Sequence, residues 1–260
     1  MAVQKRDILN DIRILQLIRG ILFLAGALAL VVMLKDQRIP INALYVTKDA
    51  LTSQSQTVFV PALKNLFDAP VAFMAATALV VSGGIALYRY GRGQDAYKKE
   101  IKKGDTPLKW IDVGVSSAII IEIVALFAGV SDPGTVKMCA GAIVATCALG
   151  WLADRQNAAT KKPDWSAYAI SVLTGILPWL AIASSLLFTA IYGMVRLPWY
   201  SYALAGAMLV GFGLLAINQM KGIKKVGSWK KYNFVERNYL IIDVAIKVAF
   251  VAILLVGLKG

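Results

Sequence analysis

The sequence predicts an all-α membrane protein, a bundle of seven transmembrane helices with a small external β-hairpin after the first helix. The chain has 260 residues, 58% of them hydrophobic, against ~45–50% apolar residues in a typical soluble domain. Its apolar runs are continuous rather than alternating, and they reach the ~20 residues that a helix needs to cross a bilayer. We expect a single domain over residues 1–260.

The apolar runs set the order of the predicted elements. The connection after the first run, residues 35–68, contains two β-prone stretches, INALYV (41–46) and QTVFV (56–60), separated by polar residues. Two such stretches with a polar turn between them predict a hairpin. The seven predicted spans are residues 12–34, 69–91, 107–130, 134–154, 165–193, 198–220 and 236–258.

Positive charge is distributed unevenly between alternate connections. The chain carries 28 Lys and Arg and a net charge of +13, which by itself would fit nucleic-acid binding. Most of these residues, however, lie at the N-terminus and in the connections after spans two, four and six. The positive-inside rule then predicts a multi-pass cell-membrane protein with a cytoplasmic N-terminus and an extracellular C-terminus. Contact with anionic lipid accounts for the basic connections without nucleic acid.

Ionisable residues within the spans are the candidates for function, because charge is costly at membrane depth. The last span contains IIDVAIKVAF, residues 241–250, with Asp243 one turn before Lys247 on the same helix face. Asp112 lies in the third span at a similar depth, one turn after Lys109. Two carboxylates and a buried lysine are thus expected to share a cluster. The residues alone fit either a structural ion pair or a lysine that forms a Schiff base.

Other chemistry is disfavoured by what the sequence lacks. The chain contains no His, the commonest metal ligand and near-neutral acid–base group. We find no pattern of nucleophile and base and no metal-ligand spacing, so we predict neither an enzyme nor a metal site.

Several motifs in order along the chain carry a family resemblance. They are LKWIDVGVSS (108–117), GWLAD (150–154), GILPW (175–179) and SWKKYNFVERNYLIIDVAIK (228–247). Together they resemble the helix signatures of heliorhodopsins, microbial-type retinal proteins with inverted membrane topology. The resemblance implies a light-absorbing photoreceptor that binds all-trans retinal and forms a homodimer. It leaves the signalling partner unknown.

The resemblance also implies roles for individual residues. Lys247 matches the lysine that carries retinal as a protonated Schiff base, and Asp112 matches its counterion, where the family usually has Glu. Asp243, where many members have serine, would be a second counterion. The remaining matches to the retinal pocket are Ser82, Ser116, Ser117, Pro178, Trp179 and Phe212.

Two function classes remain open. A sensory or regulatory photoreceptor without net ion pumping is favoured by the family. The alternative is a light-driven or light-gated proton transporter that uses Asp112, Asp243 and Glu122. Glu122 stands in the apolar stretch AIIIEIV (118–124), so we expect a lone carboxyl there, a candidate proton carrier. A retinal-free enzyme or transporter has no motif in its favour.

Overall fold

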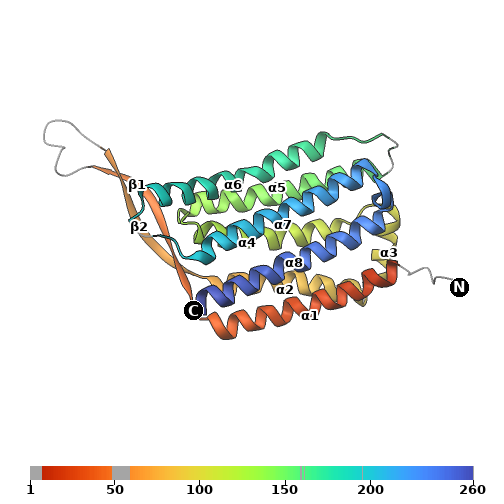
Figure 1. Ribbon diagram of the computed structural model, residues 1–260, viewed down its shortest axis with the longest axis horizontal. Helices are drawn as coiled ribbons and strands as arrows, with labels where there is room; N and C mark the ends of the chain where they lie inside the picture. Colours follow the sequence, from red (N-terminus) through yellow and green to blue (C-terminus); the bar gives the residue numbers. More distant parts are fainter. Residues whose placement is uncertain (1–7, 49–58, 159, 161, 195, 260) are drawn as a thin grey trace.

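Long helices that lie side by side form the body of the molecule (Figure 1). The computed structural model describes residues 8–48, 59–158, 160, 162–194 and 196–259. Within these residues, seven helices are long and apolar enough to cross a membrane, which confirms the predicted fold class. They are α1 (Ile8–Leu34), α2 (Val71–Tyr90), α4 (Pro107–Phe127), α5 (Pro133–Ala158), α6 (Ser166–Tyr192), α7 (Trp199–Lys224) and α8 (Tyr232–Lys259).

The fourth helix of the chain, α4, is the centre of the bundle. In its apolar stretch 72% of the residues are buried, against 17% in α6. Helix α4 packs against α2 and α5, while α8 packs against α1 and α7. A residue on α4 therefore meets other helices on nearly every side, whereas most of α6 faces outward. The first residues of α1 and the last residues of α8 lie at opposite ends of the bundle (Figure 1), as an odd number of spans requires.

The external hairpin is present and is longer than predicted. Strand β1 (Arg38–Lys48) pairs antiparallel with β2 (Phe59–Pro70), with a register shift between Ile41 and Asn42. Residues 56–58 of the predicted second strand lie outside the described residues. Beyond them the strand continues ten residues further than position 60, because pairing with β1 holds residues whose own β propensity is low.

The hairpin is fixed to the bundle at the turn between α4 and α5. The Asn42 backbone N–H donates to the Ser131 carbonyl at 3.0 Å. Ile41 of β1 and Ala69 of β2 are buried in an apolar cluster with residues of α4 and α5. This contact orients the hairpin relative to the helices.

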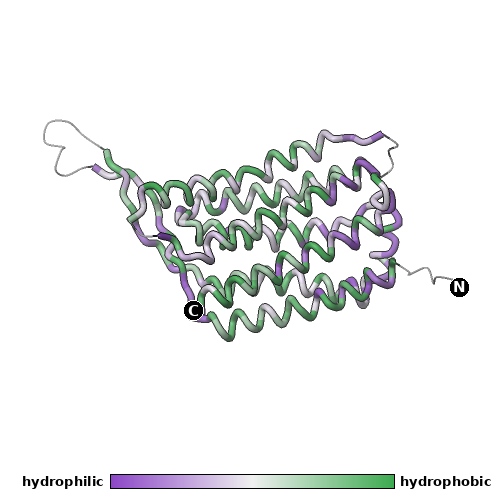
Figure 2. Tube along the Cα trace, in the orientation of Figure 1, coloured by the Kyte–Doolittle hydropathy of each residue, from purple (hydrophilic) through white to green (hydrophobic). Residues whose placement is uncertain are grey.

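A short helix, α3 (Gln94–Lys103), occupies the basic connection after α2, for which no helix was predicted. Many residues of this helix are charged, but two residues one turn apart, Tyr97 and Ile101, are buried. The helix ends at Gly104, whose φ of 72° is left-handed and suits glycine. Figure 2 shows hydrophilic residues gathered at this end of the bundle, beside a hydrophobic middle.

Candidate functional site

The amine of Lys247 lies in the interior of the bundle, midway along α8. Lys247 is 1% exposed. Its Nζ lies 2.8 Å from Asp243 Oδ1, one turn earlier on α8, and donates to Ser82 Oγ of α2 at 2.6 Å. The predicted pairing of Lys247 with Asp243 is therefore present, and Ser82 adds a second contact from a neighbouring helix.

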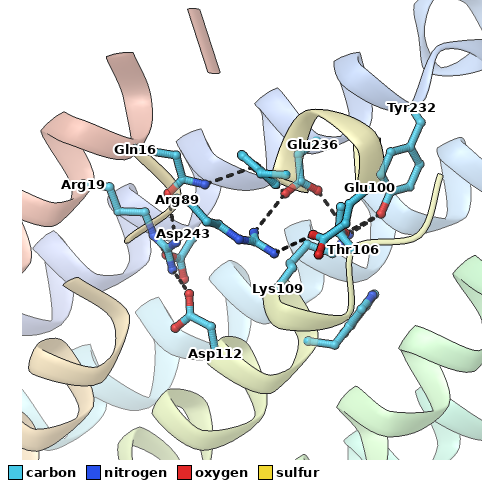
Figure 3. Close-up of polar contacts among 12 residues, drawn as sticks. Gln16, Arg19, Arg89, Glu100, Thr106, Lys109, Asp112, Tyr232, Glu236 and Asp243 are labelled. Carbon is cyan, nitrogen blue, oxygen red and sulfur yellow. Dashed lines mark hydrogen bonds and ion pairs between the residues drawn. The ribbon is translucent and has the colours of Figure 1, made fainter. Parts of the chain in front are cut away.

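Asp112 joins the same group from α4. One of its carboxylate oxygens accepts the Ser82 hydroxyl proton, and the other accepts a hydrogen bond from the Arg19 guanidinium. Arg19 Nε donates to Asp243 Oδ2 at 2.7 Å. Arg19, Ser82, Asp112, Asp243 and Lys247 thus form one connected set, which we call the lysine cluster; Figure 3 shows three of its members.

Arg19 lies within the first predicted span, but no spacing in the sequence indicates its partners. It is fully buried. With Lys247 it supplies two positive charges against the two carboxylates, so the cluster is neutral when all four groups are ionised. Buried charges persist when each has an opposite partner and satisfied hydrogen bonds. The direct contact of the amine is with Asp243, and Asp112 is reached through Ser82.

Close packing of α1 on α2 brings Arg19 into the interior. A Cβ atom added to Gly20 would lie 2.5 Å from the Leu87 side chain, and one added to Gly83 would lie 3.1 Å from Leu24. Only small residues at both positions allow the two helices to approach this closely. The position of Arg19 therefore depends on its glycine neighbour.

A second buried ionic group lies nearer the end that contains α3. We call it the glutamate cluster: Arg89, Tyr97, Lys109, Asp154 and Glu236. Lys109 Nζ lies 3.1 Å from Asp154 and 3.3 Å from Glu236, and Arg89 lies 3.6 Å from Glu236. Lys109, one turn before Asp112 in the sequence, therefore pairs with other carboxylates and does not belong to the lysine cluster.

A glutamine and a tyrosine connect the two clusters; Figure 3 labels the glutamine, Gln16. Arg19 donates to Gln16 Oε1 at 3.5 Å, and Gln16 Nε2 donates to the Tyr97 hydroxyl at 3.0 Å. Tyr97 in turn donates to Glu236 Oε1 at 2.7 Å. Burial and the neighbouring Glu236 carboxylate raise the pKa of Tyr97 well above its ordinary value. The hydroxyl therefore keeps its proton and the connection is neutral.

Spacing on α8 was the one sequence signal that points to Glu236. Glu236, Asp243 and Lys247 are separated by seven and four residues, which places them along one helix face. The prediction started the last span at Glu236 and so treated it as a boundary residue. In the structure it is fully buried.

A cavity of about 250 Å³ lies among α4, α5, α6, α7 and α8. Three of the predicted pocket residues line it: Ser117, Trp179 and Phe212. The Trp179 and Phe212 rings pack edge to face with centroids 5.9 Å apart. Lys247 is not among the lining residues, because its amine is held by Ser82 and Asp243.

Two further pocket candidates lie outside the cavity lining. Ser116 donates its hydroxyl proton to the Asp112 backbone carbonyl at 2.8 Å, one turn earlier on α4. Pro178 is buried within α6. Both are thus placed beside residues of the site, Asp112 and Trp179.

Glu122 does not fit the lone carboxyl that its apolar stretch predicted. Its Oε1 accepts a hydrogen bond from Lys137 Nζ at 2.7 Å, and Lys137 is on the neighbouring helix α5 with its side chain 72% exposed. The expectation of an isolated acid is wrong because Lys137, from the next span, extends across to Glu122. Glu122 thus links α4 to α5.

Comparison with known proteins addresses the fold and the family. No curated protein matches the chain. The crystal structure of the transmembrane domain of Salpingoeca rosetta rhodopsin phosphodiesterase is similar, with a TM-score of 0.66 and 12% sequence identity, covering 96% of this chain and 86% of that one. At this identity the likeness supports the fold alone. A family model, Heliorhodopsin, matches residues 12–258. The chain belongs to the heliorhodopsin family.

Proposed function

We propose that this chain is a retinal-binding photoreceptor in which Lys247 carries all-trans retinal as a protonated Schiff base. The family supports a retinal photoreceptor. The observation that carries the assignment of Lys247 is its amine, 1% exposed and within 2.8 Å of a carboxylate in the middle of the last helix.

The residues around Lys247 fit such a group. A retinal site needs a buried amine, anions beside it and a mostly apolar slot with few polar anchors. The lysine cluster supplies the first two, and the cavity lined by Trp179, Phe212 and Ser117 supplies the slot. When bound, retinal supplies absorption of visible light and a change of shape on isomerisation. The amine must lose a proton before it reacts as a nucleophile, and Asp243 Oδ1 lies 2.8 Å away to receive it.

Asp112 is proposed as the main counterion and Asp243 as the second. The cavity borders α4 at Val113 and Ser117, so a lysine directed into it leaves Asp243 and approaches the helix that carries Asp112. Arg19 stays bonded to both carboxylates and limits the negative charge that they present. The two acids therefore act as one coupled pair.

We further infer a sensory role without net ion transport and a cytoplasmic N-terminus. The end of the bundle with α3 holds most of the basic connections, which supports this orientation. The pairing of Glu122 with Lys137 removes the isolated acid on which the transport alternative partly rested. Illuminated vesicles containing the protein are expected to show no change of external pH, and a sustained change would favour transport.

The decisive experiment compares two buried lysines. Protein carrying Lys247→Ala, supplied with all-trans retinal, should fold but stay colourless. Lys109→Ala, which removes the other deeply buried lysine of the bundle, should still form a pigment. Visible absorption of the purified proteins, with circular dichroism to verify helical content, gives the answer. A coloured Lys247→Ala variant would refute the assignment.

A further inference from the structure

A second cavity, of about 530 Å³, opens at the end of the bundle that holds α3 and the 3-10 helix η1 (Gly227–Lys230). Its volume is within the ~300–1,000 Å³ of small-molecule sites. Its walls come from α3, α5, α7, η1 and α8. Five of the lining residues are lysines from three separate positions along the chain: Lys102 and Lys103, Lys225, and Lys230 and Lys231.

The positive charge of this cavity is not compensated by acids. Within the described part of the chain, none of the five lysines forms an ion pair. The acid among the lining residues, Asp154, is already paired with Lys109 at 3.1 Å. A concave surface lined by charges of one sign concentrates the field and attracts the opposite ion. Its charge therefore favours an anionic occupant.

The lysines are carried by backbone of defined geometry. Lys102 and Lys103 end α3 just before the left-handed Gly104. Lys225 caps α7 with a φ of 53°, and its Nζ donates to the Thr160 carbonyl at 2.6 Å. Such caps fix where the side chains start, so an anion in the cavity would meet these lysines without first having to order the backbone.

Polar groups deeper in the cavity also suit a hydrated, hydrogen-bonding occupant. Tyr232, Asn233 and Gln219 contribute to the lining. Asn233 Oδ1 is buried and has no hydrogen-bond partner among the described residues. A buried acceptor without a donor is costly, and a hydroxyl or a water held by an occupant would satisfy it.

We propose that this cavity binds a phosphate-bearing anion with several negative charges, either a soluble polyphosphate group or a phosphorylated lipid headgroup. Lysine ammonium groups are point-charge ligands for phosphate. Five of them around one cavity exceed what a single carboxylate would balance, and a multiply charged anion matches them. The positive-inside pattern alone accounts for lysines spread over this end of the molecule, and it does not account for five of them around one cavity.

The proposed anion site adjoins the cavity next to Trp179. Asp154, Gln219 and Val235 line both cavities, and Gln219 Nε2 donates to Asp154 Oδ1 at 3.0 Å. An anion in the basic cavity would therefore lie one layer of side chains from the slot assigned to retinal. Binding of the anion does not depend on the assignment of Lys247, so the two proposals can fail separately.

The test uses tripolyphosphate as the probe and calorimetry as the readout, on protein in detergent free of phospholipid. The wild type should bind tripolyphosphate with saturation. Lys102→Gln with Lys103→Gln should weaken binding roughly tenfold or more, because two of five positive charges are lost. The matched control is Lys98→Gln with Lys99→Gln, which removes the same charge from the same helix but not from the cavity lining. It should change affinity less than about twofold.

Nanodiscs distinguish the two sources of phosphate. Tripolyphosphate binding is measured in phosphatidylcholine discs with and without phosphatidylglycerol. Binding that phosphatidylglycerol abolishes assigns the cavity to a lipid headgroup, and binding that persists assigns it to a soluble anion. Absence of saturable binding in detergent and in phosphatidylcholine discs, or equal weakening by the two double variants, would overturn the proposal. Circular dichroism of both variants, which does not require a pigment, verifies folding.

Discussion

The lysine cluster and the glutamate cluster contain similar residues and differ in how their polar atoms are satisfied. Each combines arginine, lysine and acidic side chains in the interior of one helix bundle. In the lysine cluster every ion pair or hydrogen bond between members is 2.8 Å or shorter. In the glutamate cluster the ion pairs span 3.1–3.6 Å, and the hydrogen bond from Tyr97 to Glu236 is the short contact, at 2.7 Å. Arg89 Nε and Glu236 Oε2 are buried without a hydrogen-bond partner among the described residues.

This difference indicates different tasks. A fully bonded group of balanced charges holds its members in one arrangement, as an amine that must be positioned for chemistry requires. A loosely paired group, in which Glu236 lies near two cations, can exchange partners with little loss. Since Gln16 and Tyr97 connect the clusters, a change of charge at the first can be relayed to the second.

The largest effect should come from Arg19→Gln, which removes the guanidinium that bonds to both carboxylates of the lysine cluster. Asp112 and Asp243 would then share Lys247 as their cation, and breaking a buried pair costs ~3–5 kcal/mol. We expect a strongly lowered unfolding temperature in detergent and little pigment. Arg19→Gln combined with Asp243→Asn restores the charge balance and should recover part of the stability. A single variant as stable as the double variant would contradict the charge-balance account.

The next largest effects are expected from replacing the carboxylates Asp112 and Asp243. The absorption spectrum should distinguish their roles. An anion beside a protonated Schiff base stabilises the ground state more than the excited state, so its removal shifts absorption to the red. Asp112→Asn should give the larger red shift and Asp243→Asn the smaller, and acidification of the wild type should shift in the same direction. A larger shift in Asp243→Asn would reverse the proposed roles.

Removing the negative charge of Glu236 from the glutamate cluster should lower the stability of the protein and leave its absorption maximum nearly unchanged. Glu236→Gln leaves Arg89 and Lys109 short of an anion, at a cost of ~1–3 kcal/mol. The absorption maximum should move far less than in Asp112→Asn, because the hydrogen-bonded path from Glu236 to Arg19 runs through two neutral side chains, Tyr97 and Gln16. Thermal unfolding and visible spectra of the same sample measure both effects. A colour shift as large as that of Asp112→Asn would show that the two clusters behave as one.

A smaller effect is expected from pH at the edge of the glutamate cluster. Burial raises the pKa of Glu100 on α3, although Arg89 offsets part of this. A raised carboxyl pKa means that the folded state binds the proton more tightly than the unfolded state. Stability should therefore fall slightly as pH rises from the ordinary glutamate pKa, ~4.3, through the raised value. Glu100→Gln should remove that part of the pH dependence of the unfolding temperature, and an unaltered dependence would exclude Glu100 as its source.

The smallest effect should come from breaking the ion pair between Glu122 and Lys137, which belong to neither cluster. Lys137→Gln removes the partner of Glu122, but the lysine side chain is 72% exposed, and exposed pairs contribute ~0–1 kcal/mol. We expect an unfolding temperature and a photocycle close to those of the wild type, with Lys64→Gln of the hairpin as the exposed-lysine control. A slowed recovery of the pigment in Lys137→Gln would return Glu122 to the list of proton carriers.

Sequence patterns predicted what depends on local spacing and missed what depends on contacts between distant segments. The seven spans follow from hydropathy, and the contact of Lys247 with Asp243 follows from a spacing of four on one helix. The partners of Arg19 lie 93 and 224 residues away, and no local pattern contains them. Helix α3 was not predicted because its ten residues, many of them charged, are too few to show a recognisable helical pattern. The partners of Lys109 come from α5 and α8, and its spacing from Asp112 does not indicate them.

The burial of Arg19 constrains how the protein can be made. Helix α1 is synthesised before the other six spans, and it enters the bilayer with a guanidinium, which translocon-based measurements assign a cost of ~2.5–3.5 kcal/mol at the centre of a helix. Its two carboxylate partners belong to α4 and to α8, the final helix of the chain. The positive charge of Arg19 on α1 is therefore fully neutralised only after α8 has joined the bundle. Assembly of the bundle can be completed only after α8 has been inserted, and nascent chains arrested before α8 should expose Arg19 to quality-control proteases.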